Sequence, residues 1–246
     1  MNATLRLVEK QIAMSDFKNH MEQPVRQPGQ YVTEYGIAFG PCLFLSREYG
    51  AGTSLLAEQI GEQLGWNVFD SRIVNEIAEV AHVHQFLVES VDEHVQSYWE
   101  RRWHEMLLGG FVDHKYLRCL GQVVTALAHH GRVVLVGRGA QYFLPPQCGL
   151  RVRLSAPLEM RAKRVAERTK LSLEEARLKV EKIDTERAAF IWKTFRKNAG
   201  SPVNYDLIIN TGEINIESAA KIVLTSIQEK LGVCPKNPLA AANSLH

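Results

Sequence analysis

A glycine-rich turn between an apolar run and a helical pattern is the stretch of this sequence best suited to chemistry. Residues 46–54 read Ser-Arg-Glu-Tyr-Gly-Ala-Gly-Thr-Ser, between the apolar residues 42–45 and a helical pattern over 53–64. Glycines let the backbone turn its N–H groups toward a phosphate, and a helix N-terminus adds positive dipole. The turn therefore predicts a phosphate-binding loop with Ser54 placed to ligate Mg²⁺. The predicted loop residues are Gly50, Ala51, Gly52, Thr53 and Ser54.

The loop departs from the pattern G-x-x-x-x-G-K-[ST] at two of its defining positions. Arg47 stands in place of the first Gly, and Thr53 stands in place of the Lys. A neutral Thr carries no charge to the phosphates, so Arg47, which can bind phosphate through two N–H groups, is the nearest catalytic replacement. The alternative is a plain strand-to-helix corner capped by Thr53 or Ser54, with Arg47 in a surface ion pair with Glu48 or another acid.

A highly charged helical region over residues 157–197 offers further positive groups. Arg161, Arg164 and Arg168 recur at i, i+3 and i+7, so they share one helix face. Interleaved Asp and Glu residues also fit a solvated, salt-bridged helical pair. Spacing alone leaves both interpretations open.

Composition limits the classes of protein to consider. The chain has 246 residues, 46% hydrophobic and 23% charged, which suffices for one globular domain with a core. A net charge of +2 without a Lys or Arg block predicts no nucleic-acid or membrane partner. The apolar runs are far shorter than the roughly 18 residues of a membrane span, and the N-terminus lacks a signal-peptide pattern. Four scattered cysteines favour a cytoplasmic protein with reduced thiols.

The pattern of elements predicts a three-layer α/β fold. Strand-like apolar runs alternate with helical patterns, which is typical of a parallel sheet of about five strands with helices on both faces. The expected strands are residues 42–46, 66–69, 132–137, 150–155 and 205–210. The expected units are a partly ordered N-terminal extension 1–40, a domain 41–232 with a helical insert 82–130 and a lid region 157–197, and a flexible tail 233–246.

The insert carries several histidines and an aromatic cluster. The histidines are mostly ten residues apart, which is not a ligand spacing, so no metal site is predicted there. Tyr98, Trp99 and Trp103 are expected in the core or on the surface of a homodimer.

Five blocks of the sequence, taken in their order along the chain, carry a family resemblance. They are SREYGAGTSLLAEQIGEQLGWNVFDSRIV (46–74), VLVGRGAQYFL (134–144), RVRLSAPLEMRAKRV (151–165), KIDTERAAF (182–190) and YDLIINTGEINIESAAKIV (205–223). Through these blocks the chain resembles the cytidylate-kinase-like family, a branch of the P-loop nucleoside monophosphate kinases. The resemblance covers about residues 42–231, and in that family the S-R-E-x-G-[SA]-G loop looks usual.

The resemblance implies a P-loop kinase fold and transfer of the γ-phosphoryl group of ATP, with Mg²⁺, to a nucleoside monophosphate such as CMP or dCMP. It implies an R-x-x-R element at 161–164 and a D-x-x-R element at 184–187. Arg164 and Arg187 then face phosphate as catalytic groups, and Arg161 contacts the nucleotide. Asp184 would orient an arginine or hold a Mg²⁺-bound water.

The acceptor side has three candidate residues. Asp70 occupies the position of the family's D-S element, although the alternative is that Asp70 only ends a strand and Ser71 caps the next helix. Arg72 is a candidate contact to the acceptor phosphate. Arg138 follows a strand at its carboxyl end, where ligands bind in open α/β sheets, and the alternative for it is an interior ion pair.

Two other functions fit the same residues. One is a nucleotide-binding regulatory or structural protein on a kinase fold, without phosphotransfer. The other is a kinase for a different small-molecule acceptor, because the insert 82–130 looks unlike a short CMP-binding insert. ATP turnover against a panel of acceptors separates these functions.

Overall fold

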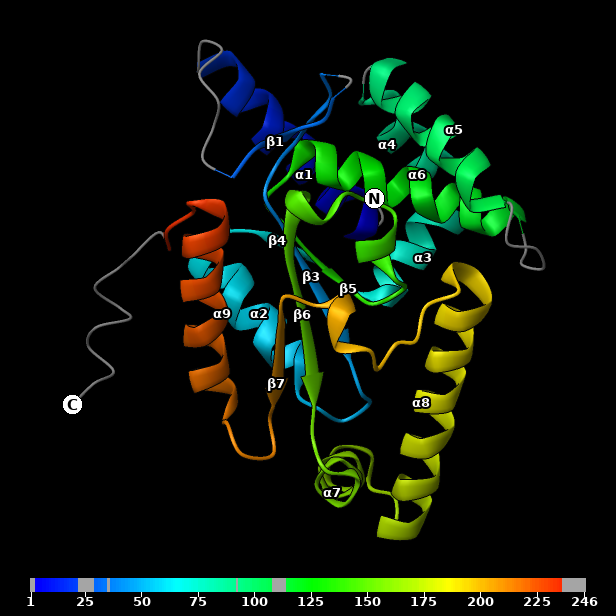
Figure 1. Ribbon diagram of the computed structural model, residues 1–246, viewed down its shortest axis with the longest axis vertical. Helices are drawn as coiled ribbons and strands as arrows, with labels where there is room; N and C mark the ends of the chain where they lie inside the picture. The colour runs from blue at the N-terminus through cyan, green and yellow to red at the C-terminus, as the bar shows by residue number, and fades with distance from the viewer. Residues whose placement is uncertain (1–2, 22–28, 35, 92, 108–113, 236–246) are drawn as a thin grey trace.

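A twisted parallel sheet forms the centre of the molecule in a computed structural model that describes residues 3–21, 29–34, 36–91, 93–107 and 114–235 (Figure 1). Within these ranges its five strands follow the order β4-β5-β3-β6-β7, and every pairing is parallel. The predicted five-stranded parallel sheet is therefore confirmed. The strands are β3 (Cys42–Arg47), β4 (Asn67–Phe69), β5 (Val133–Val136), β6 (Gly149–Ser155) and β7 (Leu207–Asn210).

Helices cover both faces of the sheet, because the apolar strands send alternate side chains to opposite sides. Leu43 and Leu45 pack in one cluster with α2 (Thr53–Leu64) and α9 (Ile216–Leu231). Cys42 and Phe44 pack in a second cluster on the other face. That cluster is built from α1 (Ala3–Met21), α3 (Ser71–Glu79), α4 (Ala81–Glu89), α5 (Glu93–Leu107) and α6 (His114–His130) (Figure 1). The three-layer fold is confirmed.

The helices α7 (Leu158–Thr169) and α8 (Leu173–Phe195) form a separate pair beyond the carboxyl end of β6 (Figure 1). Val165, Ala176 and Val180 are fully buried between them. A capping box of Ser172 and Glu175 begins α8. The region expected as a lid is thus a helical hairpin with its own small core.

The N-terminal helix α1 contacts α3, α4 and α6. Val8 and Gln11 are buried, and the Gln11 side chain accepts a hydrogen bond from Asn67 Nδ2 at 2.6 Å and donates to the Gly131 carbonyl. A short antiparallel pair, β1 (Tyr31–Val32) and β2 (Ala38–Phe39), follows. The division of the chain at residue 40 stays a prediction, and residues 22–28 and 236–246 lie outside the described ranges.

Two of the three aromatic residues expected as core or dimer surface are buried in the α5–α6 region. Tyr98 lies edge-on to Phe39 at 5.6 Å between ring centroids, and Trp99 lies 5.5 Å from Phe143. The Trp103 side chain falls outside the description. Across the described ranges, no helix is long and apolar enough to cross a membrane, and no group of three or more His, Cys, Asp or Glu side chains could hold a metal ion.

Packing of Trp99 against α6 predicts a cost for any side chain at Gly121. A Cβ atom there would lie 1.7 Å from Trp99 Cη2. We expect Gly121→Ala to lower the free energy of unfolding by about 1–3 kcal/mol, because overpacking outweighs the gain of about 1 kcal/mol in helix propensity. Urea unfolding measures this difference. Gly200→Ala is the control, since its Cβ would lie 3.4 Å from Asn198 Oδ1, and equal stability of the two variants would contradict the packing described.

Candidate active site

Two cavities lie at the carboxyl edge of the sheet and share two arginines. The loop cavity, of about 750 Å³, is lined by residues 47–55 with parts of α7, α8 and the start of α9. The inner cavity, of about 300 Å³, is lined by the ends of β3 and β6, the turn after β5, Ser71 and α8. Arg47 and Arg187 line both cavities. A ligand in either cavity would therefore lie beside Arg47 and Arg187.

The predicted phosphate loop wraps the N-terminus of α2. Gly50 and Gly52 have φ angles of 87° and 84°, a conformation that favours glycine. A Cβ at Gly50 would lie 2.9 Å from the Arg161 carbonyl oxygen. The helix begins after Gly52 without a side-chain cap, so the corner capped by Thr53 or Ser54 is not the arrangement found. Within the described residues, Thr53 Oγ1 is buried without a hydrogen-bond partner, and the exposed Ser54 lines the loop cavity.

Arg47 extends from the end of β3 across the backbone of Gly137, in the turn that follows the neighbouring strand β5. Its Nη2 donates to Ser71 Oγ at 3.1 Å, and its Nη1 lies where a Cβ at Gly137 would stand, 1.9 Å away. Burial, together with the charges of Arg187 and Arg138, lowers the pKa of Arg47 to about 10, although Asp70 opposes this shift. Arg47 is thus a cation held near other cations.

Arg138 and Arg187 rest on aromatic rings. The Arg138 guanidinium carbon lies 5.5 Å from the Phe190 ring centroid, and that of Arg187 lies 5.4 Å from the Tyr49 ring centroid. Arg138 Nε and Arg187 Nη1 are buried without a hydrogen-bond partner among the described residues. Burial also lowers the pKa of Arg187. These unsatisfied donors at the cavity walls suit an anionic ligand, because a buried donor left unpaired is costly.

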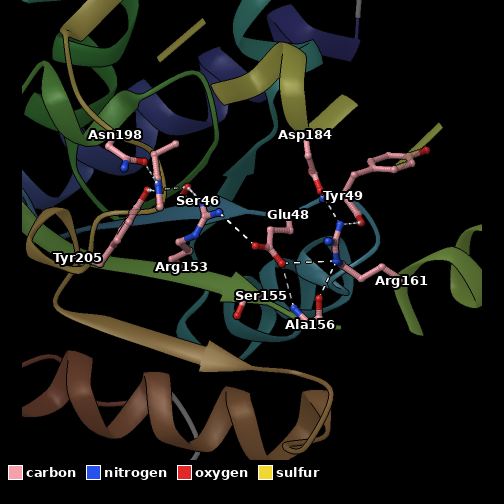
Figure 2. Close-up of polar contacts among 12 residues, drawn as sticks. Ser46, Glu48, Tyr49, Arg153, Ser155, Ala156, Arg161, Asp184, Asn198 and Tyr205 are labelled. Atoms are coloured by element: carbon pink, nitrogen blue, oxygen red, sulfur yellow. Dashed lines mark hydrogen bonds and ion pairs between the residues drawn. The ribbon is translucent and has the colours of Figure 1, made fainter. Parts of the chain in front are cut away.

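Carboxylates bind a different set of arginines (Figure 2). Arg161 is 8% exposed, and it donates to Asp184 Oδ2 at 2.5 Å and to the Tyr49 carbonyl at 3.2 Å. The other Asp184 oxygen accepts the Tyr49 N–H at 2.7 Å. As far as the described residues define the cavities, Arg161 and Asp184 lie outside both walls. Their contacts attach the glycine-rich loop to α7 and α8.

Glu48 is paired with residues other than Arg47. Its carboxylate lies 3.5 Å from Arg153 and 3.4 Å from Arg161, and it accepts the Ala156 N–H at 3.2 Å (Figure 2). The alternative pairing of Arg47 with Glu48 is therefore not the arrangement found.

Sequence reasoning missed Arg153, which lines the inner cavity. Arg153 Nη1 donates to Ser46 Oγ at 3.3 Å, and its guanidinium lies 5.7 Å from the Tyr205 ring centroid. Tyr205 in turn donates to the Ala199 carbonyl at 2.7 Å. A charged residue inside the otherwise apolar end of a strand, two positions after Arg151, was the available signal.

The remaining predicted residues are spread more widely. Arg164 lines the loop cavity and donates to the Thr211 carbonyl at 2.7 Å. Asp70, rather than the expected Ser71, caps α3 by accepting the N–H groups of Arg72 and Ile73, both at 2.9 Å. The Arg72 side chain is exposed and lies outside both described cavity walls. Roles in substrate binding for Asp70 and Arg72 stay predictions.

Known proteins share the sequence pattern and the fold. A model of the cytidylate kinase-like family matches residues 43–213. A cytidylate kinase of Pyrococcus horikoshii is 28% identical over 72% of this chain and 83% of its own length. One of Methanobrevibacter smithii is 34% identical over 39% of this chain and 55% of its own length. A solved structure of an uncharacterized protein from Eubacterium ventriosum, 18% identical, covers 76% of this chain and 98% of its own with a TM-score of 0.54, which indicates a shared fold.

The Arg161–Asp184 contact predicts a measurable coupling energy. In a double-mutant cycle of Arg161→Ala and Asp184→Ala, we expect a coupling of about 1–2 kcal/mol in the free energy of unfolding, because the pair is largely withdrawn from water. The exposed pair Arg177–Glu181, at 3.6 Å, is the control with an expected coupling below about 0.5 kcal/mol. Equal coupling in the two pairs would contradict the structural role given to Asp184.

Proposed function

Because the chain belongs to the cytidylate kinase-like family and is a phosphotransferase, we propose that it transfers the γ-phosphoryl group of ATP to a nucleoside monophosphate, with CMP or dCMP as default acceptor. The observation that carries this proposal is the sharing of Arg47 and Arg187 between two cavities. Phosphoryl transfer requires donor and acceptor in line, with positive charge at the transferring group.

The loop cavity is the proposed donor site. The backbone of residues 50–54 and the N-terminus of α2 face this cavity, and Arg164 lies in its wall. The Thr53 hydroxyl, buried without a partner among the described residues, supports a bound phosphate, since a phosphate oxygen would accept a hydrogen bond from it. Ser54 and the phosphates of ATP would hold Mg²⁺, which neutralises charge on the β- and γ-oxygens.

The inner cavity is the proposed acceptor site. Arg138 and Arg153 lie in its wall beside the two shared arginines, while Glu186 is the one acidic residue among the described lining. Such an excess of guanidinium groups favours an acceptor that carries a phosphate. The apolar side chains of Ile183, Phe190 and Ile191 from α8 supply a surface for a base or sugar.

The helical insert contributes no side chain to the described lining of either cavity. The sequence of the insert therefore does not indicate which acceptor binds. A kinase for another phosphorylated small molecule is the competing proposal. A homodimer and a cytoplasmic location stay predictions.

Turnover assays test the proposed reaction. We expect Mg²⁺-dependent consumption of ATP with CMP or dCMP in a panel of nucleoside monophosphates and other small acceptors. Transfer only to a different acceptor would replace the default acceptor and keep the kinase proposal. Absence of ATP binding by calorimetry at millimolar nucleotide would refute both.

A substitution of Arg47 tests whether this residue replaces the lysine that the loop lacks. We expect Arg47→Met to lower kcat by about 100-fold or more, the loss typical for removal of one group that stabilises transition-state charge. Arg118→Ala is the control, because Arg118 is an exposed cation on α6 that pairs with Glu100 at 3.3 Å. Unchanged kcat in Arg47→Met would remove Arg47 from the catalytic groups.

The same substitution, Arg47→Met, is expected to raise stability although it lowers kcat. Arg47→Met removes a partly buried cation near Arg138 and Arg187, so the free energy of unfolding of the ligand-free protein is expected to rise by about 1 kcal/mol. Chemical denaturation of both proteins in phosphate-free buffer measures the difference. A clear loss of stability would indicate that the main role of Arg47 is to stabilise the fold and not to bind a ligand.

A further inference from the structure

Tyr49 of the phosphate loop contacts α7 and α8 through its backbone and through its ring. Its backbone N–H and carbonyl bind Asp184 and Arg161 (Figure 2). Its hydroxyl oxygen accepts from Arg168 Nη2 at 3.2 Å, and the Arg168 guanidinium lies 5.5 Å from the ring centroid. The Arg187 guanidinium also lies beside the ring, at 5.4 Å.

The Tyr49 ring can hold the Arg187 cation without occupying its N–H donors. Arg187 lines both cavities and lies near Arg47, Arg138 and Arg153, which repel its charge, while the carboxylate of Asp184 attracts it without an ion pair between the two among the described residues. A carboxylate in direct contact would hold the cation but would also take its N–H donors and cancel its charge. An aromatic ring attracts the cation through its π-electrons and takes no N–H group, and Arg187 Nη1 is in fact left unpaired among the described residues.

We propose that Tyr49 is a positioning residue for phosphoryl transfer, whose ring holds Arg187 at the junction of the two cavities with its donors free for phosphate. This inference rests on the proposed function. Tyr49 itself does not touch the reacting atoms; it acts through Arg187. The competing role is purely structural, because Tyr49 also packs against the small core of Val165, Ala176 and Val180.

Two substitutions separate the ring from the hydroxyl group. Tyr49→Phe keeps a ring and loses the contact of the hydroxyl group with Arg168, so kcat is expected to stay within about threefold of wild type. Tyr49→Leu keeps apolar packing and loses the ring, so kcat is expected to fall about tenfold. Equal kcat in the two variants would overturn the proposal.

A double-mutant cycle on kcat tests whether Tyr49 acts through Arg187. In the Arg187→Ala background, Tyr49→Leu is expected to cause no further loss, because the cation that the ring positions is already absent. In the Arg118→Ala background it is expected to cause the full tenfold loss. An equal loss in both backgrounds would show a structural role and overturn the proposal.

A binding measurement keeps this inference distinct from the reaction itself. Inorganic pyrophosphate is expected to raise the midpoint of thermal unfolding of the wild type and of Tyr49→Phe, and to do so less for Tyr49→Leu and Arg187→Ala. The double variant should respond like Arg187→Ala alone. If no acceptor supports turnover but this pattern holds, the proposed reaction fails while the positioning of Arg187 by Tyr49 stands. A full pyrophosphate response in Tyr49→Leu overturns the positioning role.

Discussion

Mutual repulsion among guanidinium groups at the carboxyl edge of the sheet is the constraint around which the site is organised. Arg47, Arg138 and Arg187 are brought together where burial weakens their solvation, and the pKa of Arg47 falls to about 10 as a result. Such an arrangement lowers the stability of the free protein, and a bound anion raises that stability again. The excess of positive charge is therefore the feature that most directly points to phosphate.

The nearby carboxylates are used for a different purpose. Glu48 binds Arg153 and Arg161, and Asp184 binds Arg161 and the Tyr49 N–H. These contacts fix the geometry of the loop and of α7 and α8, while among the described residues no carboxylate forms an ion pair with Arg47, Arg138 or Arg187. Arg161, held by carboxylates, thus fixes the loop, whereas Arg47, Arg138 and Arg187, held by Ser71 or by aromatic rings, face the cavities. Arg153 belongs to both groups, because it binds Glu48 and lines the inner cavity.

Sequence patterns predicted the frame of the molecule better than the partners of its side chains. The sheet followed from apolar runs of the right length, and the loop followed from Gly50 and Gly52, because these depend on local chemistry. Helical spacing placed Arg161, Arg164 and Arg168 on one face but could not separate them, since the first is bound by Asp184, the second by Thr211 and the third by Tyr49. Those partners are distant in sequence and meet only in the folded chain.

The loss of the loop lysine is consistent with the position of Arg47. A lysine at position 53 would reach the phosphates from the start of α2, whereas Arg47 reaches the junction of the cavities from the end of the central strand. Strand β3 is hydrogen-bonded on both sides, to β5 and β6, so its end is among the best fixed points of the fold. Gly137 then matters because it has no side chain: a Cβ there would occupy the position of the Arg47 guanidinium. The positive charge near this loop is thus supplied by Arg47 at the end of a rigid strand, and the adjoining turn at Gly137 leaves space for its side chain.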